Sequence, residues 1–82
     1  MPDIPIVVYA TNWCPDCLRV KRFFDQHKIN YTWIDIDQDS NAEMYVYLIN
    51  EGMRSVPTIV CKDGSLLVEP TNAQLIQKFG QN

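Results

Sequence analysis

Positive charge is scarce in this 82-residue sequence, because seven Lys and Arg residues face ten Asp and Glu residues, for a net charge of −3. A nucleic-acid-binding surface needs clustered basic side chains, so no nucleic-acid partner is expected. The short basic cluster Arg19, Lys21 and Arg22 is interpreted as a solvated helix face. No apolar run approaches the roughly 18 residues that indicate a membrane span. The start Met1-Pro2-Asp3 lacks the positive charge of a secretory signal, so a cytoplasmic location is expected.

Cysteine and histidine are also few, with three cysteines and one histidine. Three cysteines cannot all pair within one chain. Cys14 and Cys17 are three positions apart, but the other soft ligands, Cys61 and His27, are far apart in the sequence. The four-ligand set of a structural zinc site is therefore not expected. In a reducing compartment the close pair is interpreted as a working dithiol and not as a structural disulfide.

Apolar residues, in contrast, make up 46% of the chain, which predicts a folded protein. A single domain over residues 1–82 is expected, burying about 60% of the surface that the unfolded chain exposes. Residues 6–10 are continuously apolar, as in a central strand covered on both faces. The segment Trp13-Cys14-Pro15-Asp16-Cys17 follows that strand directly.

A helix is predicted to begin within this segment and to end near His27-Lys28. Its apolar positions recur at helical spacing, at Cys17, Val20 and Phe24. Asn12 is expected to cap the helix, and Pro15 suits the first turn, where a missing N–H costs nothing. Cys14 would then lie at a helix N-terminus, whose free N–H groups and dipole favour the thiolate that attacks disulfides.

The middle of the chain predicts a second strand and a second helix. A strand is expected over residues 31–36, followed by the acidic run 35–39, which is interpreted as solvation. Ser40 and Glu43 have capping-box spacing and predict a second helix that ends before a C′ glycine, Gly52. The stripe of that helix is expected at Tyr45, Leu48 and Ile49.

The last third of the chain predicts a β-hairpin and a short helix. Strands over residues 54–62 and 65–68 flank Asp63-Gly64, which is interpreted as a two-residue hairpin turn. Glu69-Pro70-Thr71 is expected to open the final helix, which Gly80 ends. Its inward residues are predicted to be Leu75, Ile76 and Phe79. The resulting fold class is α/β, a mixed four-stranded sheet in the order βαβ-α-ββα with helices on both faces, and the two cysteines follow the carboxyl end of the first strand.

Cys14-Pro15-Asp16-Cys17, Ser55-Val56-Pro57-Thr58 and this element order resemble the glutaredoxin family of the thioredoxin superfamily along essentially the whole chain. The resemblance implies a thioredoxin-like fold and thiol-disulfide oxidoreductase activity. It also implies a cis peptide bond before Pro57, which faces the cysteines, and a Val56 backbone that pairs with the substrate like an added strand.

The chain departs from the common glutaredoxin pattern at several positions. Thr11 stands where Lys or Arg is common, and Asp16 stands where an aromatic residue is common. Pro70-Thr71-Asn72-Ala73 lacks the acidic residue that grips glutathione. The turn Asp63-Gly64-Ser65 is closer to mycoredoxins and bacterial glutaredoxin-like redoxins. The resemblance therefore implies no bound cofactor, with glutathione or mycothiol as the small-thiol co-substrate.

Roles follow for the remaining site residues. Cys14 is expected to attack the substrate disulfide and Cys17, one turn inward, to resolve it. Trp13 is expected to pack as a hydrophobic shield, and Asp16 to oppose the nearby thiolate. Arg54 offers a fork for a carboxylate, or is simply solvated. Together with Pro15, Val56 and Pro57, the helix-start residues Thr71 and Asn72 complete the predicted substrate or thiol groove.

Two alternatives to a small-thiol redoxin stay open. One is a [2Fe–2S] cluster bound by Cys14 of two chains. Pro15 disfavours this alternative, because the family members that this chain resembles in having proline after the first cysteine tend to be redox-active. The other is an electron donor to a reductase enzyme that is recharged by thioredoxin reductase. Under the main hypothesis the partners are disulfide-containing proteins and a small thiol or thioredoxin reductase, with the chain as a monomer and neither a metal nor a membrane involved.

Overall fold

The computed structural model describes residues 6–80, so the start Met1-Pro2-Asp3 lies outside the described residues. Seven elements follow one another in the predicted order. They are β1 (Val7–Ala10), α1 (Pro15–Gln26), β2 (Thr32–Asp35), α2 (Ser40–Ile49), β3 (Thr58–Val60), β4 (Leu66–Val68) and α3 (Asn72–Phe79). Within residues 6–80, no helix is long and apolar enough to cross a membrane.

The four strands form one mixed sheet, as the sequence predicts, and their order in it is β2-β1-β3-β4. β1 pairs in parallel with β2, with Val8 opposite Trp33, and antiparallel with β3, with Val8 opposite Ile59. β4 pairs antiparallel with β3. The strand that leads into the cysteine motif is therefore bonded on both sides.

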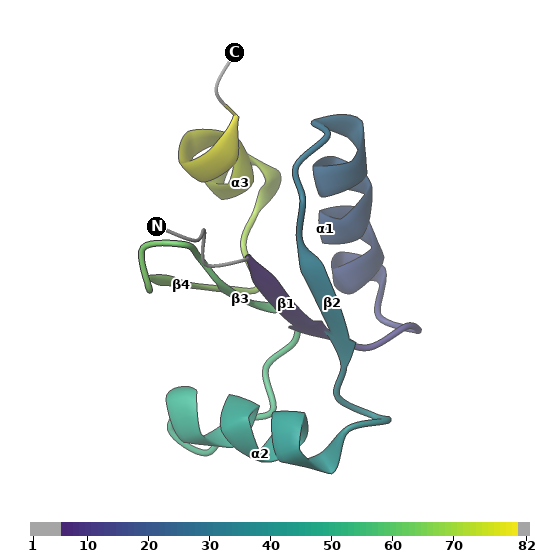
Figure 1. The fold of residues 1–82 in the computed structure, drawn as a ribbon, viewed down its shortest axis with the longest axis vertical. Coiled ribbons are helices and arrows are strands. Elements are labelled where there is room, and N and C mark those ends of the chain that lie inside the picture. Colours follow the sequence, from purple (N-terminus) through teal and green to yellow (C-terminus); the bar gives the residue numbers. More distant parts are fainter. Residues whose placement is uncertain (1–5, 81–82) are drawn as a thin grey trace.

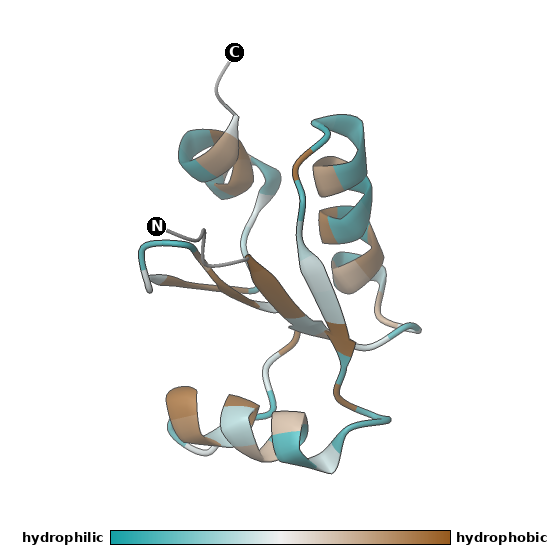
Figure 2. Ribbon diagram, viewed as in Figure 1, coloured by the Kyte–Doolittle hydropathy of each residue, from teal (hydrophilic) through white to brown (hydrophobic). Residues whose placement is uncertain are grey.

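Helices cover both faces of this sheet, with α1 and α3 on one face and α2 on the other (Figure 1). Alternation along β1 explains the two layers, because Val8 and Ala10 are fully buried on the first face while Tyr9 packs on the second. The larger core includes Val20, Phe24, Ile59 and Leu75, and the smaller core is formed by Ile36, Ala42 and Val46. In Figure 2 apolar colours mark much of β1 and of the β3–β4 hairpin, while β2 is mostly pale.

The predicted apolar stripe of α2 is wrong at Tyr45 and Leu48, while Ile49 is half-buried. Ala42 and Val46 are the buried residues, while Tyr45 is 39% and Leu48 73% exposed. The small side chains at Ala42 and Val46 let the helix approach the sheet closely, which leaves the larger ones outside. In α3 the prediction is confirmed for Leu75, which is buried, and for Phe79, which packs against the core, but it is wrong for Ile76, which is 54% exposed.

Two predicted helix caps are also wrong. Cys14, not Asn12, is the N-cap of α1, and Asn12 instead donates a hydrogen bond to the Asp35 carboxylate. Asp39, not Ser40, caps α2 by accepting from the Ala42 N–H at 3.0 Å. A capping box does occur in α3, where Thr71 and Gln74 bond each other's backbone N–H groups.

Two turns differ in detail from the prediction. The hairpin has a three-residue loop: Gly64 donates to the Cys61 carbonyl at 2.9 Å and has a φ of +86°, and Cys61 donates to the Ser65 carbonyl. After α2, Glu51 takes the C′ position with a φ of 56°. Gly52 follows it and donates to the Tyr47 carbonyl at 2.7 Å.

Glu69, at the end of β4, also has a positive φ, of 48°, and its side chain is exposed. We expect Glu69→Gly to stabilise the protein by about 0.5–1 kcal/mol. Glycine removes a left-handed penalty of about 1–2 kcal/mol, which is larger than the entropy of about 0.5–1 kcal/mol that its more flexible backbone loses on folding. Urea unfolding followed by circular dichroism measures the change. The control is Gln77→Gly in α3, where the same residue type should destabilise by about 1 kcal/mol. Equal losses in both variants would contradict the prediction.

Candidate active site

Cys14 lies where β1 has ended and α1 begins. Its backbone is extended, with φ −83° and ψ 121°, and its Sγ accepts a hydrogen bond from the Cys17 N–H at 3.4 Å. Pro15 is the first helical residue, so its missing N–H leaves no helical bond unmade. Cys14 is half-buried. Its sulfur therefore lies at the helix terminus, where free N–H groups and the helix dipole stabilise negative charge.

Cys17 lies behind it and is fully buried. Burial is the largest cause that raises the pKa of Cys17, to about 12, and the neighbouring Cys14 adds to the rise while contacts with Thr11 oppose it. At neutral pH Cys17 is therefore a protonated thiol. The two cysteines are chemically unequal, and only Cys14 combines access with a helix terminus.

The segment before β3 also carries residues that the sequence assigned to the site. The Val56–Pro57 peptide bond is cis, as the resemblance implies. Pro57 is buried and its carbonyl accepts from the Glu69 N–H at 2.9 Å. Val56 and Cys14 both pack against the larger core. Among residues 6–80, neither backbone group of Val56 takes part in a backbone hydrogen bond outside the regular elements.

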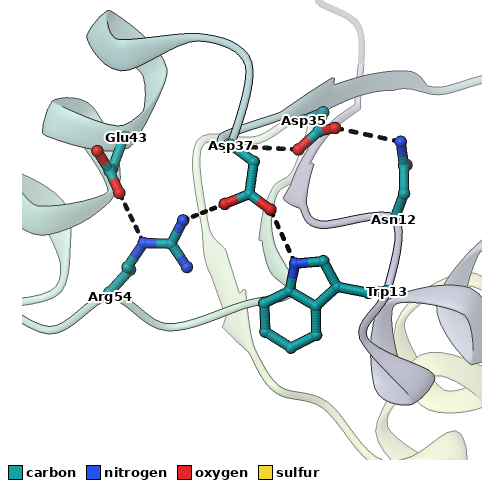
Figure 3. Close-up of polar contacts among 6 residues, drawn as sticks. All are labelled: Asn12, Trp13, Asp35, Asp37, Glu43 and Arg54. Atoms are coloured by element: carbon teal, nitrogen blue, oxygen red, sulfur yellow. Dashed lines mark hydrogen bonds and ion pairs between the residues drawn. The ribbon is translucent and has the colours of Figure 1, made fainter.

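Trp13 is not packed as the predicted hydrophobic shield. Its side chain is 67% exposed, and its indole Nε1 donates to Asp37 Oδ2 at 2.8 Å. This contact fixes the ring toward the end of β2 (Figure 3). The residue that precedes Cys14 is therefore oriented by a carboxylate that the sequence interpretation assigned to solvation.

Arg54 is 31% exposed and is bonded to two carboxylates of the protein itself. Its Nε donates to Glu43 Oε2 at 2.6 Å, and its Nη2 donates to Asp37 Oδ1 (Figure 3). The hydrogen bonds with Glu43 and Asp37 raise the pKa of Arg54, and those from Trp13 and Arg54 lower the pKa of Asp37. The predicted fork is thus occupied by two carboxylates of the protein itself.

A second polar cluster connects Asp16 to the start of α3 through Arg19. The Arg19 guanidinium donates to Asn72 Oδ1 and to the Pro70 carbonyl, both at 2.8 Å, and lies 3.5 Å from Asp16 Oδ1. The interpretation of Arg19 as a solvated residue is wrong. The cluster brings Asp16 and Asn72 to the same side of α1, while Thr71 caps α3 beside them.

Sequence reasoning missed the three acidic residues at the end of β2. Asp35 accepts from Asn12 and from the Asp37 N–H, Asp37 bonds Trp13 and Arg54, and Asp39 caps α2. For Asp39 a signal was available, because Asp directly before a helix is a preferred N-cap residue. Asp35 and Asp37 bond side chains far away in the sequence, which local patterns do not report.

Comparison with known proteins agrees with this arrangement. The glutaredoxin family model matches residues 6–66. Mycoredoxin 1 from Corynebacterium glutamicum is 38% identical over 74 residues, which cover 90% of this chain and 91% of that protein. The glutaredoxin-like protein NrdH from Lactococcus lactis subsp. cremoris is 33% identical over 58 residues, covering 71% of this chain and 78% of that protein.

Among solved structures, the crystal structure of the thioredoxin-like protein BC3987 has a TM-score of 0.77 at 29% identity, covering 88% of this chain and 96% of that one. The thioredoxin-like fold is confirmed. Because the family model spans well over half of the sequence and the relatives align over most of their length, this chain belongs to the glutaredoxin family, whose members are thiol-disulfide oxidoreductases.

Proposed function

We propose that this chain is a small dithiol redoxin that reduces protein disulfides, or mixed disulfides between a protein and a small thiol. The observation that carries the proposal is the unequal pair at the start of α1. Cys14 is half-buried at the N-cap and receives the Cys17 N–H at 3.4 Å, and Cys17 is buried one turn behind it. This is the arrangement that an attacking and a resolving thiol require.

In the first step the Cys14 thiolate attacks one sulfur of the substrate disulfide. A new S–S bond joins Cys14 to that sulfur, and the other substrate sulfur leaves as a thiolate that takes up a proton. Cys17 then gives up its proton and attacks Cys14 Sγ, which releases the second substrate thiol and leaves a Cys14–Cys17 disulfide. Two electrons pass from the redoxin to the substrate.

The substrate is proposed to lie between the Cys14 loop and the segment before β3. The free backbone of Val56 supports an added-strand pairing with an extended peptide. Trp13, Pro15 and Asp16 border the groove at α1, and Thr71 and Asn72 border it at α3. A cytoplasmic location is part of the proposal, because a working dithiol is kept reduced there.

Regeneration of the dithiol has two candidate routes. A small thiol, glutathione or mycothiol, would attack the Cys14–Cys17 disulfide, or thioredoxin reductase would reduce it and the chain would then serve as electron donor to a reductase enzyme. One observation favours the second route. The Arg54 guanidinium, which would bind a carboxylate of the small thiol, is already bonded to Asp37 and Glu43.

The experiment measures reduction of the oxidised protein by glutathione, by mycothiol, and by thioredoxin reductase with NADPH, side by side. Reduction by one of the three identifies the route, and a subsequent transfer to a protein mixed disulfide supports the proposed activity. A protein that none of them reduces, and whose dithiol form reduces no disulfide, contradicts the proposal.

The raised pKa of Cys17 makes alkylation selective. At pH 7.5 we expect iodoacetamide to modify Cys14 first, since burial keeps Cys17 protonated up to a pKa of about 12. The reactive thiolate fraction of Cys17 grows about tenfold per pH unit below that value. Mass spectrometry of the native, reduced protein should show one adduct, on Cys14, and denatured protein should show three. Simultaneous labelling of both motif cysteines at neutral pH would contradict the assignment.

A further inference from the structure

Asp37 connects the two segments that border Cys14. Its Oδ2 accepts a hydrogen bond from the indole of Trp13, the residue directly before Cys14, at 2.8 Å. Its Oδ1 accepts from Arg54, three residues before Pro57. One carboxylate therefore bonds Trp13 and Arg54 at once, as Figure 3 shows.

The carboxylate itself is held in place from several sides. The Asp37 backbone N–H donates to Asp35 Oδ1 at 2.9 Å, and Asp35 Oδ2 accepts from Asn12 at 3.1 Å. Arg54 is braced by Glu43 of α2 at 2.6 Å. The side chains of Arg54 and Asp37 are 31% and 34% exposed, so solvent screens their bond only in part.

We propose that Asp37 is a positioning residue for the disulfide exchange proposed above: it fixes Trp13 relative to Arg54 and so sets the width of the groove in which a substrate disulfide reaches Cys14. An isolated surface ion pair contributes little. Asp37 differs because it makes charge-assisted bonds to two segments far apart in the sequence. Trp13 is two-thirds exposed, so without Asp37 little packing keeps its ring in place.

The first test compares Asp37→Ala with Asp25→Ala. Asp25 is the control, because Asp25→Ala also removes one carboxylate that accepts a side-chain hydrogen bond, here a single one from Tyr31 at the other end of α1. For reduction of a mixed disulfide we expect Asp37→Ala to raise KM about tenfold, the size of one charge-assisted bond. Its kcat should stay within about twofold, because Cys14 and Cys17 are untouched. Asp25→Ala should change neither constant.

A double-mutant cycle shows whether Trp13 is the partner that matters. Trp13→Phe keeps an aromatic ring but removes the N–H that Asp37 binds. The double variant Trp13→Phe/Asp37→Ala should therefore raise KM by less than the product of the two single effects. Asp37→Asn, which keeps the shape of the side chain, should give the same direction of change to a smaller extent. Independent, multiplicative effects would overturn the proposal.

The second readout does not depend on catalysis. In a Trp33→Phe background the remaining indole is that of Trp13, and its fluorescence anisotropy should fall in Asp37→Ala and stay constant in Asp25→Ala. Unchanged anisotropy, or an unchanged KM, overturns the positioning role. If the unmutated protein reduces no disulfide, the proposed function fails, and the anisotropy alone then decides whether Asp37 fixes Trp13.

Discussion

Replacing Cys14 by serine is expected to abolish disulfide reduction, lowering the rate by roughly 10³-fold or more, to the uncatalysed background. A serine hydroxyl is not ionised at neutral pH and cannot form the S–S bond of the intermediate. The helix start that stabilises a thiolate at this position would then have no charge to act on. The measurement is turnover of a mixed-disulfide substrate at saturating reductant.

Cys17→Ser separates the two roles, because the first step still occurs and the resolving thiol is missing. The variant should accumulate a mixed disulfide between Cys14 and a protein substrate, visible as a band that reductant removes on a gel. Cys61→Ala is the matched control. Cys61 is buried directly after β3 and lies outside the motif in sequence, and its removal should leave both activity and trapping unchanged. Trapping by Cys14→Ser instead of Cys17→Ser would reverse the assignment.

The largest effect on stability is expected for Phe24→Ala, which should cost about 3–5 kcal/mol. Phe24 is fully buried in α1 and contacts the Phe79 ring of α3 edge-on, with centroids 5.1 Å apart, and the Tyr31 ring at 5.2 Å. Its removal leaves a cavity where α1, α3 and the sheet meet. A chain of this length has a total stability of only about 4–12 kcal/mol, so the variant should be partly unfolded at 37 °C. Urea and thermal unfolding measure the loss.

Leu48→Ala is the control for that experiment. Leu48 is also a large apolar residue in a helix, but it is 73% exposed on α2. Its truncation should change the free energy of unfolding by less than about 0.5 kcal/mol. A loss at Leu48 as large as that at Phe24 would mean that the outer face of α2 is covered in solution.

The order of the elements and the place of the cysteine pair were predictable from the sequence, because they depend on local signals that agree with one another. The apolar run of β1 has no competing interpretation, and Pro15 fits one position of a helix. The cis bond before Pro57 followed from resemblance alone. These predictions did not depend on which distant side chains meet.

The errors concern side chains with more than one possible partner. Asn12 and Ser40 are both suitable N-cap residues, but the side chains of Cys14 and Asp39 accept the capping hydrogen bonds. Asn12 instead donates a hydrogen bond to Asp35. The sequence predicts an Arg54 guanidinium that could bind a substrate carboxylate, whereas in the fold this guanidinium bonds Glu43 and Asp37. A choice between partners that are 11 to 23 positions apart is decided by tertiary structure, which periodicity does not report.

The central place of β1 in the sheet has a consequence for hydrogen exchange. Strands at the edges, β2 and β4, can open locally while β1 keeps its bonds to the neighbour on its other side. The amides of Val8 and Tyr9 should therefore be among the last to exchange with deuterium, close to the global unfolding limit. The loop that carries Cys14 follows β1 directly, at Thr11. Local opening of β2 or β4 therefore leaves the strand that holds this loop in place.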